Sequence, residues 1–222
     1  MKFTRKEFMH YVDHSLLRPY LTKEEVIKGL EFARDNECMS ICINPCNLDL
    51  ACQVLKGTKV KIGASVGFPS GAHTTFCKVA ETVDAFARGA DEVDMVIDIG
   101  ALKNGELDDV RNDIIAVVKA SPMIVKVILE NCYLTKEEIA TGCRLVEEAG
   151  AHYVKTSTGF GSGGAILEDI VLMRKSVSPK VKVKAAGGVA TLQDCIKMIE
   201  AGSDRIGMSR TAQILKELEA NG

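Results

Sequence analysis

Four charged residues lie within segments that otherwise have the composition of buried β-strands. They are Asp94 in EVDMVI, Lys126 in VKVILE, Lys155 in YVKTS and Lys184 in VKAA. Because the side chains of a strand alternate between its two faces, each charge points away from its valine neighbours. Buried charges are costly unless they are paired. We therefore expect the four side chains to converge and to pair with one another.

Two of these residues, Lys155 and Lys184, precede loop-forming glycines and should lie near the carboxyl ends of their strands. A lysine with its ordinary pKa of about 10.4 is almost entirely ammonium at neutral pH and cannot attack a carbonyl. Burial and a second nearby cation both lower the pKa of a lysine. The pair therefore predicts a nucleophilic amine, with Lys184 and Asp94 available to relay protons. The alternative is a structural layer of ion pairs.

Two glycine-bearing loops follow the last two predicted strands. Gly187 and Gly188 form the first loop, whereas Gly207, Ser209 and Arg210 lead into the last helix. In barrel proteins, backbone NH groups and helix N-termini at these loops commonly hold a phosphate. The two loops together predict a phosphorylated substrate. For either loop alone, a tight strand-to-helix turn is the alternative.

Other polar positions are weaker candidates. Gly159 opens the run GFGSGG, which fits the dinucleotide pattern GxGxxG. No acidic residue ends the next strand to meet a ribose, so we interpret the run as a loop in which Gly159 contributes an NH group to phosphate. Asp13 and Lys126 are candidates for substrate binding, with helix capping the alternative for Asp13. His14 and His73 lack metal-site spacing, so no metal is expected.

Short apolar runs alternate along the chain with amphipathic helical patterns. The expected strands are Met39–Asn44, Val60–Val66, Glu92–Ile97, Ile124–Glu130, His152–Ser157, Val181–Ala186 and Arg205–Met208, with an eighth at Tyr11–His14. The expected helices are Thr22–Asn36, Thr74–Arg88, Leu107–Lys119, Thr135–Ala149, Leu167–Ser176 and Thr191–Ala201. Repeated strand–helix units predict parallel strands with right-handed crossovers.

The expected fold class is α/β, a (β/α)8 barrel forming a single domain over residues 1–222. Gly89, Gly150 and Gly202 each stand where a helix ends in a left-handed residue, directly before a strand. The competing architecture is a doubly wound open sheet. We favour the barrel because charged residues inside several strands can gather around one axis. The chain contains no Pro/Gly/Ser-rich linker.

Bulk composition excludes several classes of function. The chain has 222 residues, of which 46% are hydrophobic and 26% charged, and a formal net charge of −2. The absence of a basic balance argues against nucleic acid as a partner. No run approaches the roughly 20 apolar residues that cross a bilayer, so no membrane partner is expected. Eight cysteines without any CxxC pair indicate reduced thiols and a cytoplasmic location.

The segment VKTSTGF, Val154–Phe160, resembles the signature around the Schiff-base lysine of the deoxyribose-phosphate aldolase family. Further segments resemble that family in the same order: Val12–Leu17, Ser40–Pro45, Val66–Gly71, Glu92–Ile97, Val127–Glu130, Val183–Gly188 and Arg205–Ser209. The resemblance implies a barrel enzyme that cleaves 2-deoxy-D-ribose 5-phosphate to acetaldehyde and D-glyceraldehyde 3-phosphate. It implies no metal and no organic cofactor, and it suggests a homodimer or homotetramer.

By matched position, the resemblance makes Lys155 the imine-forming lysine, Lys184 the residue that tunes it and Asp94 a proton-transfer group. It places Gly188 and Ser209 against the phosphate. Several positions depart from the family pattern. Ala190 replaces a usual arginine, Arg210 a usual serine and Asp98 a usual asparagine, and no tyrosine follows Tyr153 to act as a proton shuttle from the tail. We expect Arg210 to supply the missing cation.

Three other functions fit the same pattern of residues. The first is another lysine-dependent aldolase acting on a different phosphorylated sugar. The second is a cofactor-independent sugar-phosphate isomerase or epimerase, which would form no covalent adduct. The third is a non-catalytic binder of sugar phosphates. Binding alone does not require two lysines to be forced together, which argues against the third.

Overall fold

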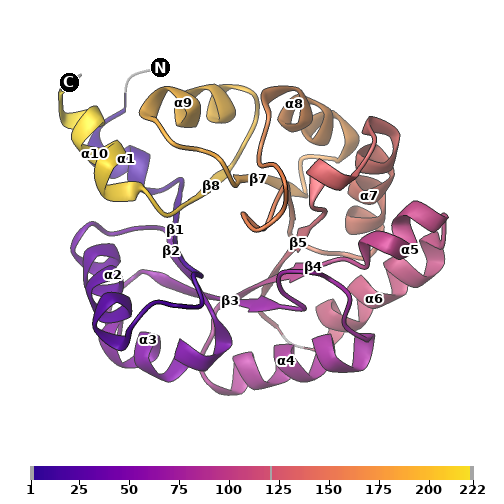
Figure 1. Ribbon diagram of the computed structural model, residues 1–222, viewed down its shortest axis with the longest axis horizontal. Helices are drawn as coiled ribbons and strands as arrows, with labels where there is room; N and C mark the ends of the chain where they lie inside the picture. Colours follow the sequence, from indigo (N-terminus) through magenta and orange to yellow (C-terminus); the bar gives the residue numbers. More distant parts are fainter. Residues whose placement is uncertain (1–2, 121, 221–222) are drawn as a thin grey trace.

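A computed structural model describes residues 3–120 and 122–220 of the chain. Eight parallel strands close into a barrel in which each strand pairs with its neighbours in chain order (Figure 1). The strands are β1 Val12–Leu16, β2 Ser40–Ile43, β3 Lys61–Val66, β4 Glu92–Val96, β5 Ile124–Ile128, β6 Tyr153–Lys155, β7 Lys182–Ala186 and β8 Arg205–Met208. The prediction of a (β/α)8 barrel is therefore confirmed, and the open-sheet alternative is excluded.

The helices form a ring around the strands (Figure 1). Their bounds are α1 Arg5–Met9, α2 Lys23–Asp35, α3 Leu48–Val54, α4 Thr75–Ala87, α5 Ile99–Asn104, α6 Leu107–Ala120, α7 Lys136–Glu148, α8 Leu167–Ser176, α9 Leu192–Glu200 and α10 Thr211–Ala220, with short 3-10 turns at Pro45–Asn47 and Asn131–Tyr133. Short helices α1, α3 and α5 were not predicted, because each is too brief to display a helical period. Within the described residues, no helix has both the length and the apolar character needed to cross a membrane.

Local signals set the ends of several helices. Thr135 forms a capping box at the start of α7, with its hydroxyl accepting from the Glu138 NH. Thr191 and Asp194 form the same arrangement at the start of α9. Gly150 has a φ of 78° and Gly202 a φ of 112°, the left-handed region in which glycine is favoured. These signals stop each helix where the next strand must begin.

Strand register carries the charged side chains to one axis. Asp94 of β4 pairs with Lys126 of β5, and Lys155 of β6 pairs with Lys184 of β7. The intervening valines are fully buried in the apolar layer between the barrel and its helices: Val93, Val125, Val154 and Val183. The barrel therefore has an apolar outer core and a charged interior.

Candidate active site

Seven charged side chains meet inside the barrel. The carboxylates are Asp13, Glu92 and Asp94, and the cations are Lys126, Lys155, Lys184 and Arg205; all are at most 7% exposed. Four of them were predicted to converge, and Asp13 was predicted only as a residue that binds substrate or caps a helix. Glu92 and Arg205 were missed, although Glu92 precedes Asp94 by two positions and so shares its face of β4. The alternation of side chains along β4 therefore also predicts that Glu92 points into the barrel.

Asp94 is the centre of this network. Its Oδ2 atom accepts from the Nζ of Lys155 at 2.7 Å and from the Nζ of Lys184 at 2.8 Å. Its Oδ1 atom accepts from the Nζ of Lys126 at 2.8 Å. Burial alone would raise the pKa of Asp94, but the three ammonium groups outweigh it and hold that pKa well below its ordinary value. Asp94 is therefore a carboxylate at neutral pH.

Lys184 lies between two carboxylates. Its Nζ atom is 2.5 Å from Asp13 Oδ2 and 2.8 Å from Asp94 Oδ2. Burial would lower the pKa of Lys184, but Asp13 and Asp94 outweigh it and raise the pKa above its ordinary value. Lys184 is therefore a cation beside Lys155 in the resting site. The sequence did not reveal how many carboxylates face this lysine.

Asp13 and Lys126 lie deeper than predicted. Asp13 accepts from Arg205 Nη1 at 2.7 Å and pairs with Lys184, so its carboxylate is part of the network and does not cap a helix. Lys126 Nζ contacts Glu92 Oε2 at 2.5 Å as well as Asp94. Neither Asp13 nor Lys126 is among the residues that line the cavity described next. Both pair with other charged residues of the network without lining the cavity.

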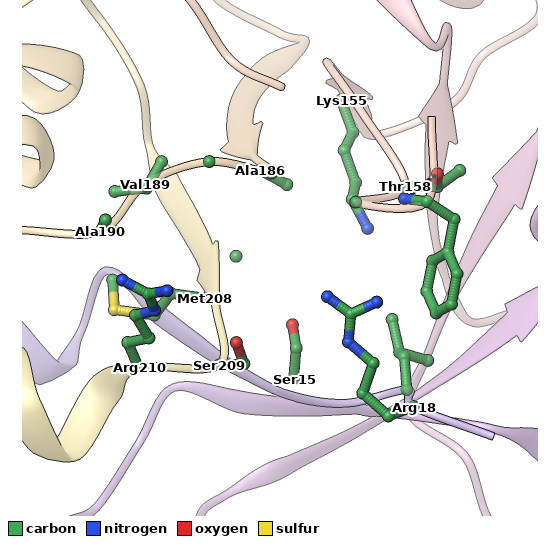
Figure 2. A pocket seen from close by; sticks show the side chains of 16 residues that line it. Ser15, Arg18, Lys155, Thr158, Ala186, Val189, Ala190, Met208, Ser209 and Arg210 are labelled. Atoms are coloured by element: carbon green, nitrogen blue, oxygen red, sulfur yellow. Dashed lines mark hydrogen bonds between the residues drawn. The ribbon is translucent and has the colours of Figure 1, made fainter. Parts of the chain in front are cut away.

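A cavity of about 320 Å³ opens at the carboxyl ends of the strands (Figure 2). Its lining comes from the ends of β1, β6, β7 and β8 and from the loops after them: Ser15, Leu17, Arg18, Lys155, Thr158, Gly159, Phe160, Ala186, Gly187, Gly188, Val189, Ala190, Gly207, Met208, Ser209 and Arg210. The sequence-predicted residues Lys155, Gly159, Gly187, Gly188, Gly207, Ser209 and Arg210 are all in this set. Sequence reasoning missed the four polar or aromatic members Ser15, Arg18, Thr158 and Phe160.

Close backbone packing explains two of the glycines. A Cβ atom on Gly164 would lie 2.3 Å from the Gly187 carbonyl oxygen, so the loop after β6 can rest directly on the loop after β7. The Ala165 NH donates to that same oxygen at 2.9 Å. A Cβ atom on Gly207 would lie 3.2 Å from Lys184 Cε. Glycine at 207 therefore leaves the room that the Lys184 side chain occupies.

The residues that follow Lys155 are hydrogen-bonded to the end of β7 and to the residues after β5. The Thr156 hydroxyl donates to the Ala186 carbonyl at 2.9 Å and accepts from the Ala186 NH at 3.0 Å. The strand β6 ends at Lys155, before the predicted limit at Ser157. On the other side, Glu130 accepts from the Thr158 NH at 3.2 Å and from the Thr158 hydroxyl. Glu130 is 1% exposed and has a left-handed φ of 57°, unusual for a residue with a side chain.

A charged barrel interior that ends in a lysine at a carboxyl-end cavity is the arrangement of a barrel enzyme, since such enzymes build their sites on this face. The model of the DeoC/LacD family of aldolases matches residues 8–214. The chain belongs to this family, and the predicted resemblance is confirmed.

Curated relatives span nearly the whole chain. A deoxyribose-phosphate aldolase of Caldanaerobacter subterraneus is 51% identical over 215 residues, covering 95% of this chain and 93% of the relative. The deoxyribose-phosphate aldolase of Brevibacillus brevis is 50% identical, with 96% of each chain covered. A tetrameric deoxyribose phosphate aldolase from Aeropyrum pernix superposes with a TM-score of 0.91 at 26% identity, covering 99% of this chain and 94% of that one. A further solved aldolase gives a TM-score of 0.92 at 36% identity, with 97% of each chain covered.

Proposed function

We propose that the protein catalyses the reversible aldol cleavage of 2-deoxy-D-ribose 5-phosphate to acetaldehyde and D-glyceraldehyde 3-phosphate, with Lys155 as the Schiff-base lysine. One observation carries this assignment: the Nζ of Lys155 lies at the cavity and shares an Asp94 oxygen with a second lysine. The curated relatives that are about half identical to the chain carry the same activity in their names.

In the proposed reaction, the Lys155 amine adds to C1 of the open-chain aldehyde, and the carbinolamine loses water to give an iminium ion. Removal of the proton from the C3 hydroxyl breaks the C2–C3 bond, and the electron pair moves into the iminium to leave an enamine. D-glyceraldehyde 3-phosphate departs. Protonation of the enamine at C2 and addition of water then release acetaldehyde and restore the amine.

Charge balance in the barrel supports Lys155 as the nucleophile. Three carboxylates face three other cations, Lys126, Lys184 and Arg205, so the interior is neutral when Lys155 is an amine. The iminium carries one positive charge, so the covalent intermediate has the same net charge as the site with Lys155 protonated. The low pKa of Asp94 means that a proton does not rest there. We propose that Asp94 and Lys184 pass protons to and from water in the cavity.

The loops after β7 and β8 are proposed to bind the phosphate. The backbone NH groups of Gly187, Gly188 and Gly207 and the hydroxyl of Ser209 supply donors at the cavity, with Gly159 adding another from the loop after β6. Arg210 supplies a cation from the loop after β8. Ala190 carries no charge and its NH donates to Asp194 at 3.3 Å.

The assignment is tested by incubating the protein with 2-deoxy-D-ribose 5-phosphate and identifying the products by mass spectrometry. Formation of acetaldehyde and D-glyceraldehyde 3-phosphate is expected, and the Lys155→Ala variant should form neither. The reverse direction should accept acetaldehyde as donor. Condensation that proceeds with ketone donors but not with acetaldehyde would transfer the assignment to a different lysine-dependent aldolase.

We also propose that residues 1–222 form one barrel domain, located in the cytoplasm, that assembles as a homodimer or homotetramer. The barrel elements run from α1 to α10 along nearly the full chain. The eight cysteines are all free thiols, which suits a reducing compartment. The tetramer from Aeropyrum pernix supports self-association. Light scattering in solution gives the assembly mass, and a monomer would contradict this part of the proposal.

A further inference from the structure

Arg18 is a cavity-lining cation that neither the sequence patterns nor the proposed phosphate loops include. It lies in the segment between β1 and α2, is exposed, and extends its guanidinium into the cavity (Figure 2). Arg210 lies on the side of Ala190, whereas Arg18 lies on the side of Thr158, facing the Ala186–Ala190 loop across the opening (Figure 2). The two arginines therefore flank the space in which a substrate would sit.

Arg18 differs from the other inward-facing cations in how its charge is matched. Lys126, Lys155, Lys184 and Arg205 each pair with a carboxylate inside the barrel. Within residues 3–120 and 122–220, no such ion pair is formed by Arg18. Its full positive charge thus faces the cavity and is available to an anionic ligand.

An aromatic contact holds Arg18 in place without neutralising it. The Arg18 guanidinium carbon lies 5.1 Å from the centroid of the Phe160 ring. Phe160 in turn packs edge-on against Phe68, with ring centroids 5.4 Å apart. A cation over an aromatic face is attracted to the ring while its NH groups stay free to donate. Segments after β1, β3 and β6 thus combine to aim one guanidinium at the cavity.

Phosphate is the anion that suits this position. A guanidinium presents a planar fork of NH donors that matches two phosphate oxygens at once. The proposed phosphate loops approach from β7 and β8 and bring backbone NH groups, Ser209 and Arg210, while Ala190 leaves the β7 loop without a cation. A dianion held from that side alone would face Arg18 across the cavity.

We propose that Arg18 is a substrate-binding residue that contacts the phosphate dianion from the side opposite the glycine loops and selects phosphorylated over unphosphorylated sugars. The inference rests on the proposed function in that it takes a sugar phosphate as substrate. Phe160 acts as a positioning residue, because it touches Arg18 and sets the direction of its side chain.

The test compares the variants Arg18→Met and Arg18→Lys with the unaltered protein. KM and kcat are measured for 2-deoxy-D-ribose 5-phosphate and for 2-deoxy-D-ribose, together with the inhibition constant of inorganic phosphate. Arg18→Met should raise KM for the phosphorylated sugar about tenfold, as expected for a lost charge-assisted bond near solvent. It should weaken inhibition by phosphate similarly and leave kcat/KM for the unphosphorylated sugar within about twofold. The KM of Arg18→Lys for the phosphorylated sugar should lie between those of Arg18→Met and the unaltered protein, because lysine keeps the charge but lacks the planar fork of NH donors.

Two controls separate charge from packing. Phe160→Leu removes the ring but keeps Arg18, and should raise KM for the phosphorylated sugar by only about threefold. Lys182→Met is the matched control: Lys182 also lies over an aromatic ring, 5.8 Å from the Tyr153 centroid, but at the start of β7 and away from the cavity lining. Its kinetic constants should be unchanged.

An Arg18→Met variant that loses equal activity on both sugars, or that keeps its affinity for phosphate, would overturn the proposal. Failure of the proposed function has a different signature, because the unaltered protein would then cleave neither sugar. Direct binding of inorganic phosphate, measured by calorimetry, remains accessible in that case, so the role of Arg18 is tested either way.

Discussion

Lys155 and Lys184 donate to the same carboxylate oxygen, Oδ2 of Asp94, at 2.7 and 2.8 Å. Two ammonium groups on one oxygen repel each other, and the repulsion is relieved when one of them loses its proton. Asp13 holds the Lys184 side of this pair at 2.5 Å. Lys155 has only the Asp94 carboxylate and faces the cavity, so it is the member of the pair that a substrate can reach.

Replacing Lys184 by methionine should therefore lower kcat by about a hundredfold or more, the scale expected for losing a proton-transfer group. Asp94 would then keep only Lys126 and Lys155 as partners, and no second lysine would share its Oδ2 atom with Lys155. Steady-state kinetics measure the effect. Unchanged kcat would refute this role of Lys184.

Arg205→Met is the matched control for Lys184→Met. Arg205 also pairs with Asp13, at 2.7 Å, but its other partner is Glu92 rather than Asp94. Both variants leave a buried carboxylate short of a partner, so each should lose about 3 kcal/mol of stability, which chemical denaturation measures. Assayed below its Tm, Arg205→Met should keep most of its kcat.

Glu130 is expected to position the loop that carries the lining residues Thr158 and Phe160. Glu130→Ala removes the acceptor of the Thr158 NH and hydroxyl, and should lower kcat about tenfold by loosening this loop. Glu130→Gln retains an acceptor oxygen and should recover most of the loss. Glu130→Gly suits the left-handed φ of 57° but lacks the acceptor. If the glycine variant were as active as the unaltered protein, the hydrogen bonds between Glu130 and Thr158 would be dispensable.

Arg210→Ala should raise KM for 2-deoxy-D-ribose 5-phosphate by about fivefold and leave kcat on the unphosphorylated sugar unchanged, because an exposed charge contributes modestly to phosphate affinity. Steady-state kinetics on the two sugars provide the comparison. Unaltered affinity for the phosphorylated sugar would mean that Arg210 does not compensate for Ala190.

His14 should make the fold sensitive to mild acid. Burial lowers the pKa of His14 to about 4, beneath the pKa of about 6.5 expected in the unfolded chain. Above pH 6.5 both states are neutral and His14 has no effect. As the pH falls from 6.5 to 4 only the unfolded state gains the proton, so stability decreases by on the order of 3 kcal/mol, with no further loss below.

Urea unfolding at pH 7.5 and pH 5 measures this effect of His14. The His14→Asn variant should lose part of the pH dependence, whereas variation at exposed His10 should preserve it. An identical pH dependence in His14→Asn and the unaltered protein would assign the acid sensitivity to other groups.

The strand alternation in the sequence predicted the barrel and most of its charged interior. Asp94, Lys126, Lys155 and Lys184 stand out because a charge inside a run of valines is readable from one segment alone. Arg205, which opens its strand, has no apolar residue before it within β8 and was missed. The pKa of Lys184 could not be predicted, since its direction depends on carboxylates from strands distant in sequence.

Arg18 illustrates a different limit. It lies outside any strand, so no periodicity fixes where its side chain points. Its direction is set by Phe160, which is more than half the chain length away in sequence. Phe160 is in turn packed against Phe68, in the loop after β3. Phe160 was visible in the sequence only as part of a family-like segment. Contacts between loops of different βα units leave no local pattern that a sequence can display.

The identity of the nucleophile is the central claim. The most direct measurement incubates the protein with acetaldehyde, reduces it with borohydride and maps the modified residue by mass spectrometry, with Lys155→Ala alongside. An ethyl adduct confined to Lys155 and absent from the variant is the predicted result. An adduct on Lys184, or none on the folded protein, would contradict the account.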